Sequence, residues 1–239
     1  SADDTSGWTE ETFNAAIRGL SEIHSIWYDN VNEIRKEHWM SNIVDTQSMT
    51  DKVSLWRTWS NFASDQFPQY YPEKTREMIA FLIDTIPEWQ PKLDAMTKTL
   101  IHNDFNPRNI TFRKDGPAPK LCVYDWELAT VAVPQQDLAE LLAFTAFDDI
   151  TEEQVNEYIE LHRTCLEKET GKTIDPVTWR EGYQYSLYNL AVYRLAMYFM
   201  GERITPYPFM GRLYKTLPHL LAIELKGSAH TQSQQTTEG

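Results

Sequence analysis

Apolar residues recur at steps of three and four along most of this chain, which is the period of a helix with one buried face. The first such stripe follows Thr9, a residue that can cap a helix, and the acidic Glu10 and Glu11 suit the positive end of a helix dipole. Two further stripes predict a helix over residues 51–66 and another with Pro72 in its first position. We therefore expect the first third of the chain to be helical.

The only clear β signal lies in the middle of the sequence. Residues 99–101 read as a short strand, and the segments 109–113 and 120–124 flank the turn sequence Lys114-Asp115-Gly116-Pro117. Two short apolar runs around such a turn predict a β-hairpin.

Helical patterns then return. The sequence Thr151-Glu152-Glu153-Gln154 is a capping box, and it predicts a helix that ends at Gly171. A long helix should begin at Asp175-Pro176 and stop at Gly201, and a last one over 209–225 should bend or break at Pro218. The predicted fold class is α+β, predominantly helical, with a small central β-hairpin region.

The domain organisation follows from these patterns. We expect a leader at 1–8, one folded unit over 9–226, and a disordered tail at 227–239, which is polar almost throughout. The first residues have neither the basic nor the apolar stretch of a signal peptide. They also lack an initiator Met, which suggests either a piece of a longer chain or the remnant of a tag.

Charge and cysteine content exclude several classes of protein. The 239 residues carry 35 acidic and 22 basic side chains and a net charge of −13, which disfavours a nucleic-acid partner. The acidic balance would suit a cationic small molecule, although acidic surfaces usually serve only solubility. Two cysteines cannot form a disulfide scaffold or a four-cysteine zinc site, so we expect reduced thiols in the cytoplasm. No apolar run approaches the roughly 20 residues of a membrane span.

The most informative residues surround the predicted hairpin. Asp104 and Asn109 are five residues apart on a loop between two strands, and Asp125 ends the strand that returns beside that loop. Phosphoryl transfer needs a carboxylate to orient the attacking hydroxyl and oxygen ligands for Mg²⁺ on the nucleotide phosphates. Two carboxylates and an amide in one pocket would meet that need. The alternative is that all three residues only stabilise turns.

The spacing resembles the catalytic loop H-x-D-x-x-x-x-N of protein-kinase-like enzymes and its following metal-binding Asp. Asp125-Trp126-Glu127 is closer to the aminoglycoside phosphotransferase and choline kinase branch of that superfamily. Asp137-Leu138-Ala139 and Leu20-Ser21-Glu22-Ile23-His24 match further elements of that branch. His102-Asn103-Asp104 is more like choline and ethanolamine kinases than the His-Gly-Asp of antibiotic kinases.

The resemblance implies roles for five residues. Asp104 would be the catalytic base, Asn109 and Asp125 the magnesium ligands, and His102 and Asp137 supports of the loop. The catalytic loop would span 102–109, the metal-binding segment 125–127, and the cofactors would be ATP and Mg²⁺. Asp137 could instead be only the N-cap of a helix, and His102 is more simply a packed loop histidine.

The sequence departs from the family in one respect. A kinase-like enzyme needs an N-terminal lobe with a phosphate-covering Gly-rich loop and a strand Lys. None of the 9 glycines forms such a loop, and the first Lys is Lys36. We therefore expect a C-terminal lobe that lacks its N-terminal lobe and is inactive alone.

Aromatic residues offer a weaker hint about the acceptor. Several lie where the choline kinase branch places its substrate and could form a cage for a quaternary amine, although aromatic residues at helical spacing are usually core. They are Trp56, Trp59, Trp179, Tyr183, Tyr185 and Tyr188.

Two functional hypotheses remain. The first is an ATP- and Mg²⁺-dependent phosphotransferase that transfers the γ-phosphoryl group to a small-molecule hydroxyl, such as that of an amino alcohol, a sugar or an aminoglycoside-like acceptor. The alternative is a non-catalytic kinase-fold binding or regulatory domain of a larger protein.

Overall fold

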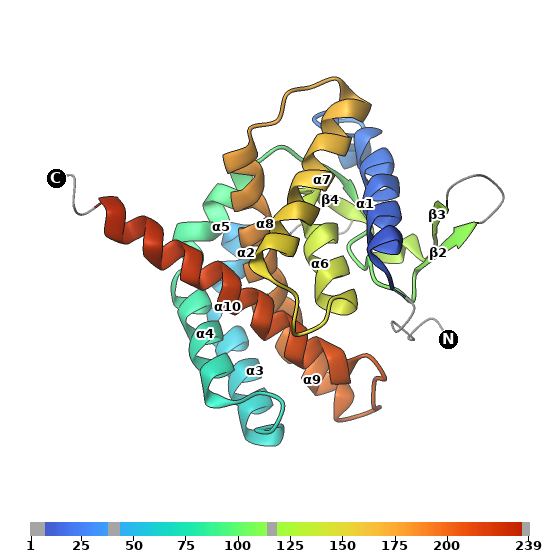
Figure 1. Ribbon diagram of the computed structural model, residues 1–239. Helices are drawn as coiled ribbons and strands as arrows, with labels where there is room; N and C mark the ends of the chain where they lie inside the picture. Colours follow the sequence, from blue (N-terminus) through green and yellow to red (C-terminus); the bar gives the residue numbers. More distant parts are fainter. Residues whose placement is uncertain (1–7, 38–43, 114–118, 236–239) are drawn as a thin grey trace.

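A computed structural model describes residues 8–37, 44–113 and 119–235. Residues 1–7 of the expected leader and residues 114–118, which include the predicted hairpin turn, lie outside the described residues, as do 38–43 and 236–239. Helices form most of the fold, and four short strands form two small antiparallel sheets (Figure 1).

In the described part of the chain, five α-helices precede the first strand. Thr9 caps the first of them, since its hydroxyl accepts a hydrogen bond from the Thr12 amide at 3.3 Å. The helix predicted over 51–66 begins only at Val53, and the short helix before it was not predicted. Pro72 is the cap residue and not the first helical residue. The bounds are α1 (Glu10–Ser25), α2 (Thr46–Asp51), α3 (Val53–Gln66), α4 (Glu73–Asp84) and α5 (Ile86–Ala95).

The strands pair as two separate ribbons. β1 (Thr99–Ile101) lies antiparallel to β4 (Thr130–Ala132), a strand that the sequence did not predict. β2 (Ile110–Arg113) and β3 (Lys120–Val123) form the predicted hairpin, with Ile110 opposite Val123.

The second half of the fold is helical. The Thr151 capping box is confirmed at the start of α7 (Glu152–Thr170), and Gly171 follows that helix with a φ of +67°, which favours glycine. The long helix predicted from Pro176 is present but divided into α8 (Pro176–Leu190), a π-helical turn (Ala191–Leu195) and α9 (Ala196–Glu202). Before α7 lies α6 (Gln135–Thr145), and after α9 lies α10 (Met210–Gln235).

The predicted break at Pro218 does not occur, because α10 continues through it. Leu217, Leu220 and Leu221 are buried on this helix, and their packing offsets the loss of one backbone hydrogen bond. The helix enters the polar segment 227–239 and its backbone is helical to Gln235, whereas we expected disorder from residue 227. Residues 236–239 lie outside the described part.

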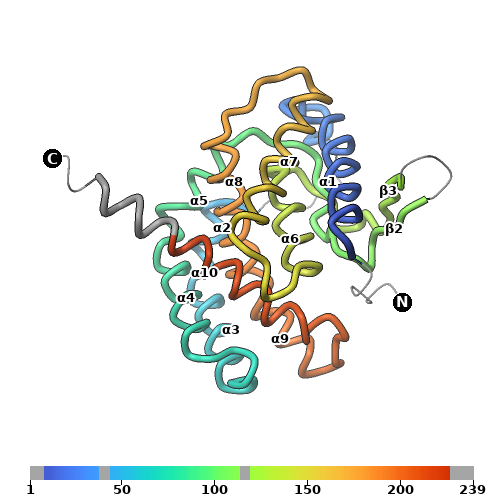
Figure 2. Tube along the Cα trace, in the orientation of Figure 1, coloured from blue at the N-terminus to red at the C-terminus, as the bar shows by residue number. Residues whose placement is uncertain are grey.

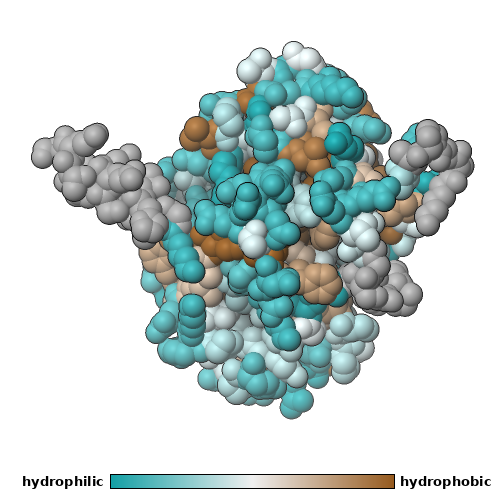
Figure 3. Space-filling view, in the orientation of Figure 1, coloured by the Kyte–Doolittle hydropathy of each residue, from teal (hydrophilic) through white to brown (hydrophobic). Residues whose placement is uncertain are grey.

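α6 is the central element of the core. All its residues are buried, and α8 and α10 pack against it. α1 lies along α7 in both views of the chain (Figures 1 and 2). Polar side chains predominate on the face shown in Figure 3, and apolar ones gather mainly in the seams between helices. Because α6 is buried, a polar side chain on it is shielded from water. It is stable there only if other protein groups form hydrogen bonds or ion pairs with it.

Among the described residues, no helix is long and apolar enough to cross a bilayer.

Candidate active site

One buried carboxylate, that of Asp137, holds the loop between β1 and β2 in position. Asp137, in the first turn of α6, accepts hydrogen bonds from the backbone amides of His102 and Asn103, each at 2.8 Å. Its side chain is fully buried, and Pro134 rather than Asp137 precedes the helix as its cap residue. Asp137 is therefore not an N-cap; its hydrogen bonds join α6 to the loop.

Asn103 has a backbone conformation that few residues adopt. Its φ is +62°, a left-handed value that Gly and Asn tolerate best. Its side-chain amide donates to the carbonyl of Leu128 at 3.0 Å, and its own carbonyl accepts from Arg194. This conformation explains why an Asn can occupy the position where a Gly would also fit.

The carboxylate of Asp104 is held by two amide side chains of its own loop. Asn109 Nδ2 donates to one carboxylate oxygen at 2.6 Å, and Asn106 Nδ2 donates to the other at 2.9 Å. Arg194 lies 3.7 Å from the latter oxygen. The side chain of Asp104 is 21% exposed, so a ligand can reach a carboxylate whose orientation is already set.

A second buried pair supports the loop, and sequence reasoning missed both members. Glu140, one turn after Asp137 on α6, accepts from the Phe105 amide at 2.9 Å and from Arg194 at 2.6 Å. Burial raises the pKa of the Glu140 carboxyl, and the facing Arg194 guanidinium opposes that shift. Burial would lower the pKa of Arg194, but Glu140, Tyr198 and Asp104 together raise it above its ordinary value.

Arg194 reaches this position from the π-helical turn between α8 and α9. Such turns often occur at functional sites, because one inserted residue changes the direction of the side chains around it. No local sequence signal marks this turn, so a helical pattern alone could not have identified Arg194.

Two histidines extend the network of Asp137 away from the loop. His24 Nε2 lies 3.1 Å from Asp137, and its other ring nitrogen lies 3.2 Å from His162 Nε2. Both rings are fully buried, and His162 Nδ1 has no hydrogen-bond partner among the described residues. The pKa of His162 lies well below its usual range, because burial disfavours the charged ring and His24 adds repulsion.

Asn109 and Asp125 lie at the same end of the β2–β3 ribbon. The Tyr124 amide donates to the Asn109 carbonyl at 3.0 Å, which places the residue before Asp125 beside Asn109. Asp125 has a left-handed φ of +64° and an exposed side chain. No hydrogen bond joins the side chains of these two described residues.

The oxygen donors of these two residues suit a magnesium ion. The Asn109 amide nitrogen is committed to Asp104, and its oxygen accepts no hydrogen bond within the described part of the chain; the Asp125 carboxylate makes no ion pair there either. Mg²⁺ is usually bound through one or two protein oxygens together with phosphates and water. Among the described residues, no group of three or more His, Cys, Asp or Glu is placed to hold a metal ion.

His102 connects the loop to the segment that carries Asp125. Its Nε2 lies 3.0 Å from the Tyr124 carbonyl, so that nitrogen carries the proton. Its ring also packs edge-on against Trp126, at 4.8 Å between ring centroids. His102 is buried and thus has a packing role in addition to any effect on the chemistry.

A cleft of about 740 Å³ opens beside Asp104, and Arg194 is part of its wall. Of the six aromatic residues considered for an acceptor cage, only Trp59 lines this cleft, where Tyr193 joins it. Trp56 packs edge-on against both. The others are core residues outside the cleft, so the larger cage is not formed: Trp179, Tyr183, Tyr185 and Tyr188.

Comparison with known proteins identifies the family. A model of the phosphotransferase enzyme family matches residues 9–170, and the chain therefore belongs to this family. No curated protein matches the sequence significantly.

Two solved structures share the fold. One is a Ralstonia eutropha JMP134 protein classed among the aminoglycoside phosphotransferases, with a TM-score of 0.58, 16% identity, and coverage of 92% of this chain and 68% of that one. The other is choline kinase from Cryptosporidium parvum Iowa II, with a TM-score of 0.56, 11% identity, and coverage of 95% and 69%. This likeness concerns the fold, and it confirms the predicted α+β, predominantly helical class and its resemblance to the C-lobe of kinase-like phosphotransferases.

The buried tie at Asp137 leads to a first prediction. Asp137→Asn keeps the shape of the side chain but replaces one carboxylate oxygen by an NH₂ group. That group faces one of the three donors to Asp137, which are the amides of His102 and Asn103 and the ring of His24, so the free energy of unfolding should fall by about 1–3 kcal/mol. Urea denaturation measures this loss. The matched change Asp149→Asn, at an exposed residue, should stay within about 0.5 kcal/mol. Equal effects of the two changes would contradict the assigned role of Asp137.

The pKa of His162 predicts a dependence of stability on pH. The unfolded chain takes up a proton near pH 6.5, whereas the folded chain does so only at lower pH, so the free energy of unfolding should fall as the pH drops below about 6.5. His162→Gln removes this group, so the slope of the free energy of unfolding against pH should decrease by up to about 1.4 kcal/mol per pH unit. Denaturation curves between about pH 5 and 7 measure both slopes, and identical slopes would contradict the account.

Proposed function

We propose that this member of the phosphotransferase enzyme family provides the catalytic and metal-binding residues for transfer of the γ-phosphoryl group of ATP to a hydroxyl group of a small molecule. The observation that carries the proposal is the position of Asn109, whose amide nitrogen holds the Asp104 carboxylate while its oxygen stays uncommitted. One side chain can thus orient the catalytic base and contribute a ligand to Mg²⁺.

Asp104 would act as the base. Its carboxylate is oriented by Asn106 and Asn109 and remains partly exposed beside the cleft, so it can accept a hydrogen bond from an acceptor hydroxyl and then its proton. The nearby Arg194 offsets negative charge at this point and keeps the loop in place through Asn103.

Asn109 and Asp125 would hold the metal, and His102 and Asp137 would support the loop. When bound, Mg²⁺ supplies positive charge that neutralises the phosphate oxygens during transfer. Asp125 is exposed at the end of the ribbon, where phosphates can approach.

The cleft limits the kind of acceptor. Among the described residues that line it, Asp94 is the only carboxylate besides Asp104, and both oxygens of Asp94 already accept hydrogen bonds, from Thr46 and Gln90. A polycationic acceptor would need several unengaged carboxylates. An acceptor that is neutral or carries one positive charge beside Trp59 and Tyr193 fits these walls better.

The residues that cover the phosphates would come from outside this sequence, which contains no Gly-rich loop. The same absence favours the second candidate, a kinase-fold binding domain that does not catalyse. The two candidates differ in whether ATP turnover appears when the longest natural form of the protein receives Mg²⁺ and a panel of amino alcohols and sugars.

The variants Asp104→Asn and Asp125→Asn distinguish the base from the metal ligand in that longest form. Asp104→Asn removes the proton acceptor, so kcat should fall by about 10²–10⁴-fold with little change in ATP binding. Asp125→Asn weakens the metal site, so excess Mg²⁺ should restore part of its activity and none of that of Asp104→Asn. Steady-state kinetics over a range of Mg²⁺ concentrations measure both effects.

Full activity in both variants would place the site elsewhere. Activity that is absent in the unaltered protein on every acceptor would favour the non-catalytic domain.

A further inference from the structure

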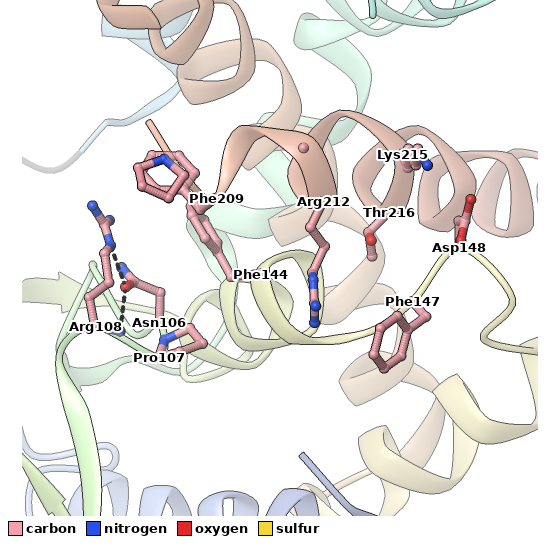
Figure 4. A pocket seen from close by; sticks show the side chains of 12 residues that line it. Asn106, Pro107, Arg108, Phe144, Phe147, Asp148, Phe209, Arg212, Lys215 and Thr216 are labelled. Atoms are coloured by element: carbon pink, nitrogen blue, oxygen red, sulfur yellow. Dashed lines mark hydrogen bonds between the residues drawn. The ribbon is translucent and has the colours of Figure 1, made fainter. Parts of the chain in front are cut away.

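A second cavity, of about 310 Å³, lies against the loop that carries Asp104. Asn106, Pro107 and Arg108 of the loop form one side, and residues of the first turns of α10 form the other (Figure 4). Of the residues that line this cavity, only Arg108 and Phe209 also line the cleft beside Asp104. Their side chains stack at 4.4 Å and separate the two spaces.

The charge of this cavity is opposite to that of the protein. Arg108, Arg212 and Lys215 line it against the single carboxylate of Asp148, although the whole chain has a net charge of −13. The Lys215 amino group makes no hydrogen bond or ion pair within the described chain. Cationic groups gathered in a hollow of an otherwise acidic protein produce a local field that attracts anions.

Two side chains that line this cavity form hydrogen bonds between α10 and the end of α6. Arg212 donates to the carbonyl of Thr145 at 3.1 Å, and Thr216 donates to that of Ala146 at 3.0 Å, so α10 is fastened to the last turn of α6. These contacts hold the guanidinium of Arg212 in a fixed position at the cavity wall. A ligand would therefore meet a preorganised cation, which lowers the entropy cost of binding.

The cavity also offers an apolar surface. Phe147 packs against the Arg212 guanidinium at 4.5 Å and is 46% exposed, and Pro107 and Phe144 add apolar contacts. The volume is at the lower end of the range of small-molecule sites. The ligand that fits is compact, negatively charged and partly flat and apolar.

We propose that this cavity binds a small organic phosphate whose ester group is flat and apolar. A phosphate monoester carries up to two negative charges and three acceptor oxygens, which suit the two cations Arg212 and Lys215 better than the single charge of a carboxylate ligand would. Lys215 and Arg212 contact the phosphate, and Phe147 contacts the flat group. The bound molecule also touches Asn106, whose side chain holds the Asp104 carboxylate.

Calorimetric titration with phenyl phosphate tests the proposal, with benzylamine as a probe of the same ring and opposite charge. Phenyl phosphate should bind at one site, and benzylamine, whose single positive charge suits the cleft beside Asp104, should not displace it from this cavity. Lys215→Glu should weaken binding about tenfold or more, and Phe147→Ala should weaken it severalfold. Neither residue lines the cleft beside Asp104, so binding in that cleft would survive both changes.

Lys168→Glu is the matched control, because it makes the same charge change at an exposed lysine of α7 that lines neither cavity. Its affinity for phenyl phosphate should equal that of the unaltered chain. Three results would overturn the proposal: no binding at millimolar phenyl phosphate, displacement of phenyl phosphate by benzylamine, or unchanged affinity in Lys215→Glu.

Discussion

The hydrogen bonds of the buried Asp137 carboxylate are the constraint on which the rest of the site depends. A fully buried charge is tolerated only when it is well partnered, and Asp137 accepts from two consecutive loop amides and faces His24. Its place in the first turn of α6 adds the favourable field of the helix dipole. The loop is thereby joined to the most buried helix of the fold.

One helical turn later, Glu140 repeats the arrangement. Residues three apart lie on the same face of a helix, so Asp137 and Glu140 both face the loop, and each accepts a backbone amide from it. Arg194 completes the second tie and approaches Asp104 from α8–α9. Three segments far apart in sequence thus fix the position of one carboxylate, which suits a group that must meet a substrate in a set geometry.

The features that the sequence predicted correctly are those that depend on residues close together in the chain. Thr9 and Thr151 cap helices, and the hairpin follows from two short apolar runs, because these signals act within a few residues. The pattern of His102, Asp104, Asn109 and Asp125 identified the loop, and Asp104 and Asn109 are in contact. The metal-binding and catalytic roles of these residues stay predictions.

What the sequence did not predict depends on contacts between distant segments. β4 is too short to show a pattern and forms only because it pairs with β1. Arg194 and Glu140 look like ordinary helical residues until the π-helical turn and α6 bring them together. The aromatic residues considered for a cage are mostly core, as is usual at helical spacing, and that spacing did not tell that Trp59 is the one that lines the cleft.

The most direct test concerns the metal. Electron paramagnetic resonance of Mn²⁺, titrated with the longest natural form of the protein and a non-hydrolysable ATP analogue, measures how tightly the ion is held. Asn109→Ala and Asp125→Ala should each weaken binding about tenfold or more, while Asp149→Asn, at an exposed carboxylate outside the metal-binding segment, should leave it unchanged. Equal Mn²⁺ affinity in all four proteins would contradict the assignment of Asn109 and Asp125 as the ligands.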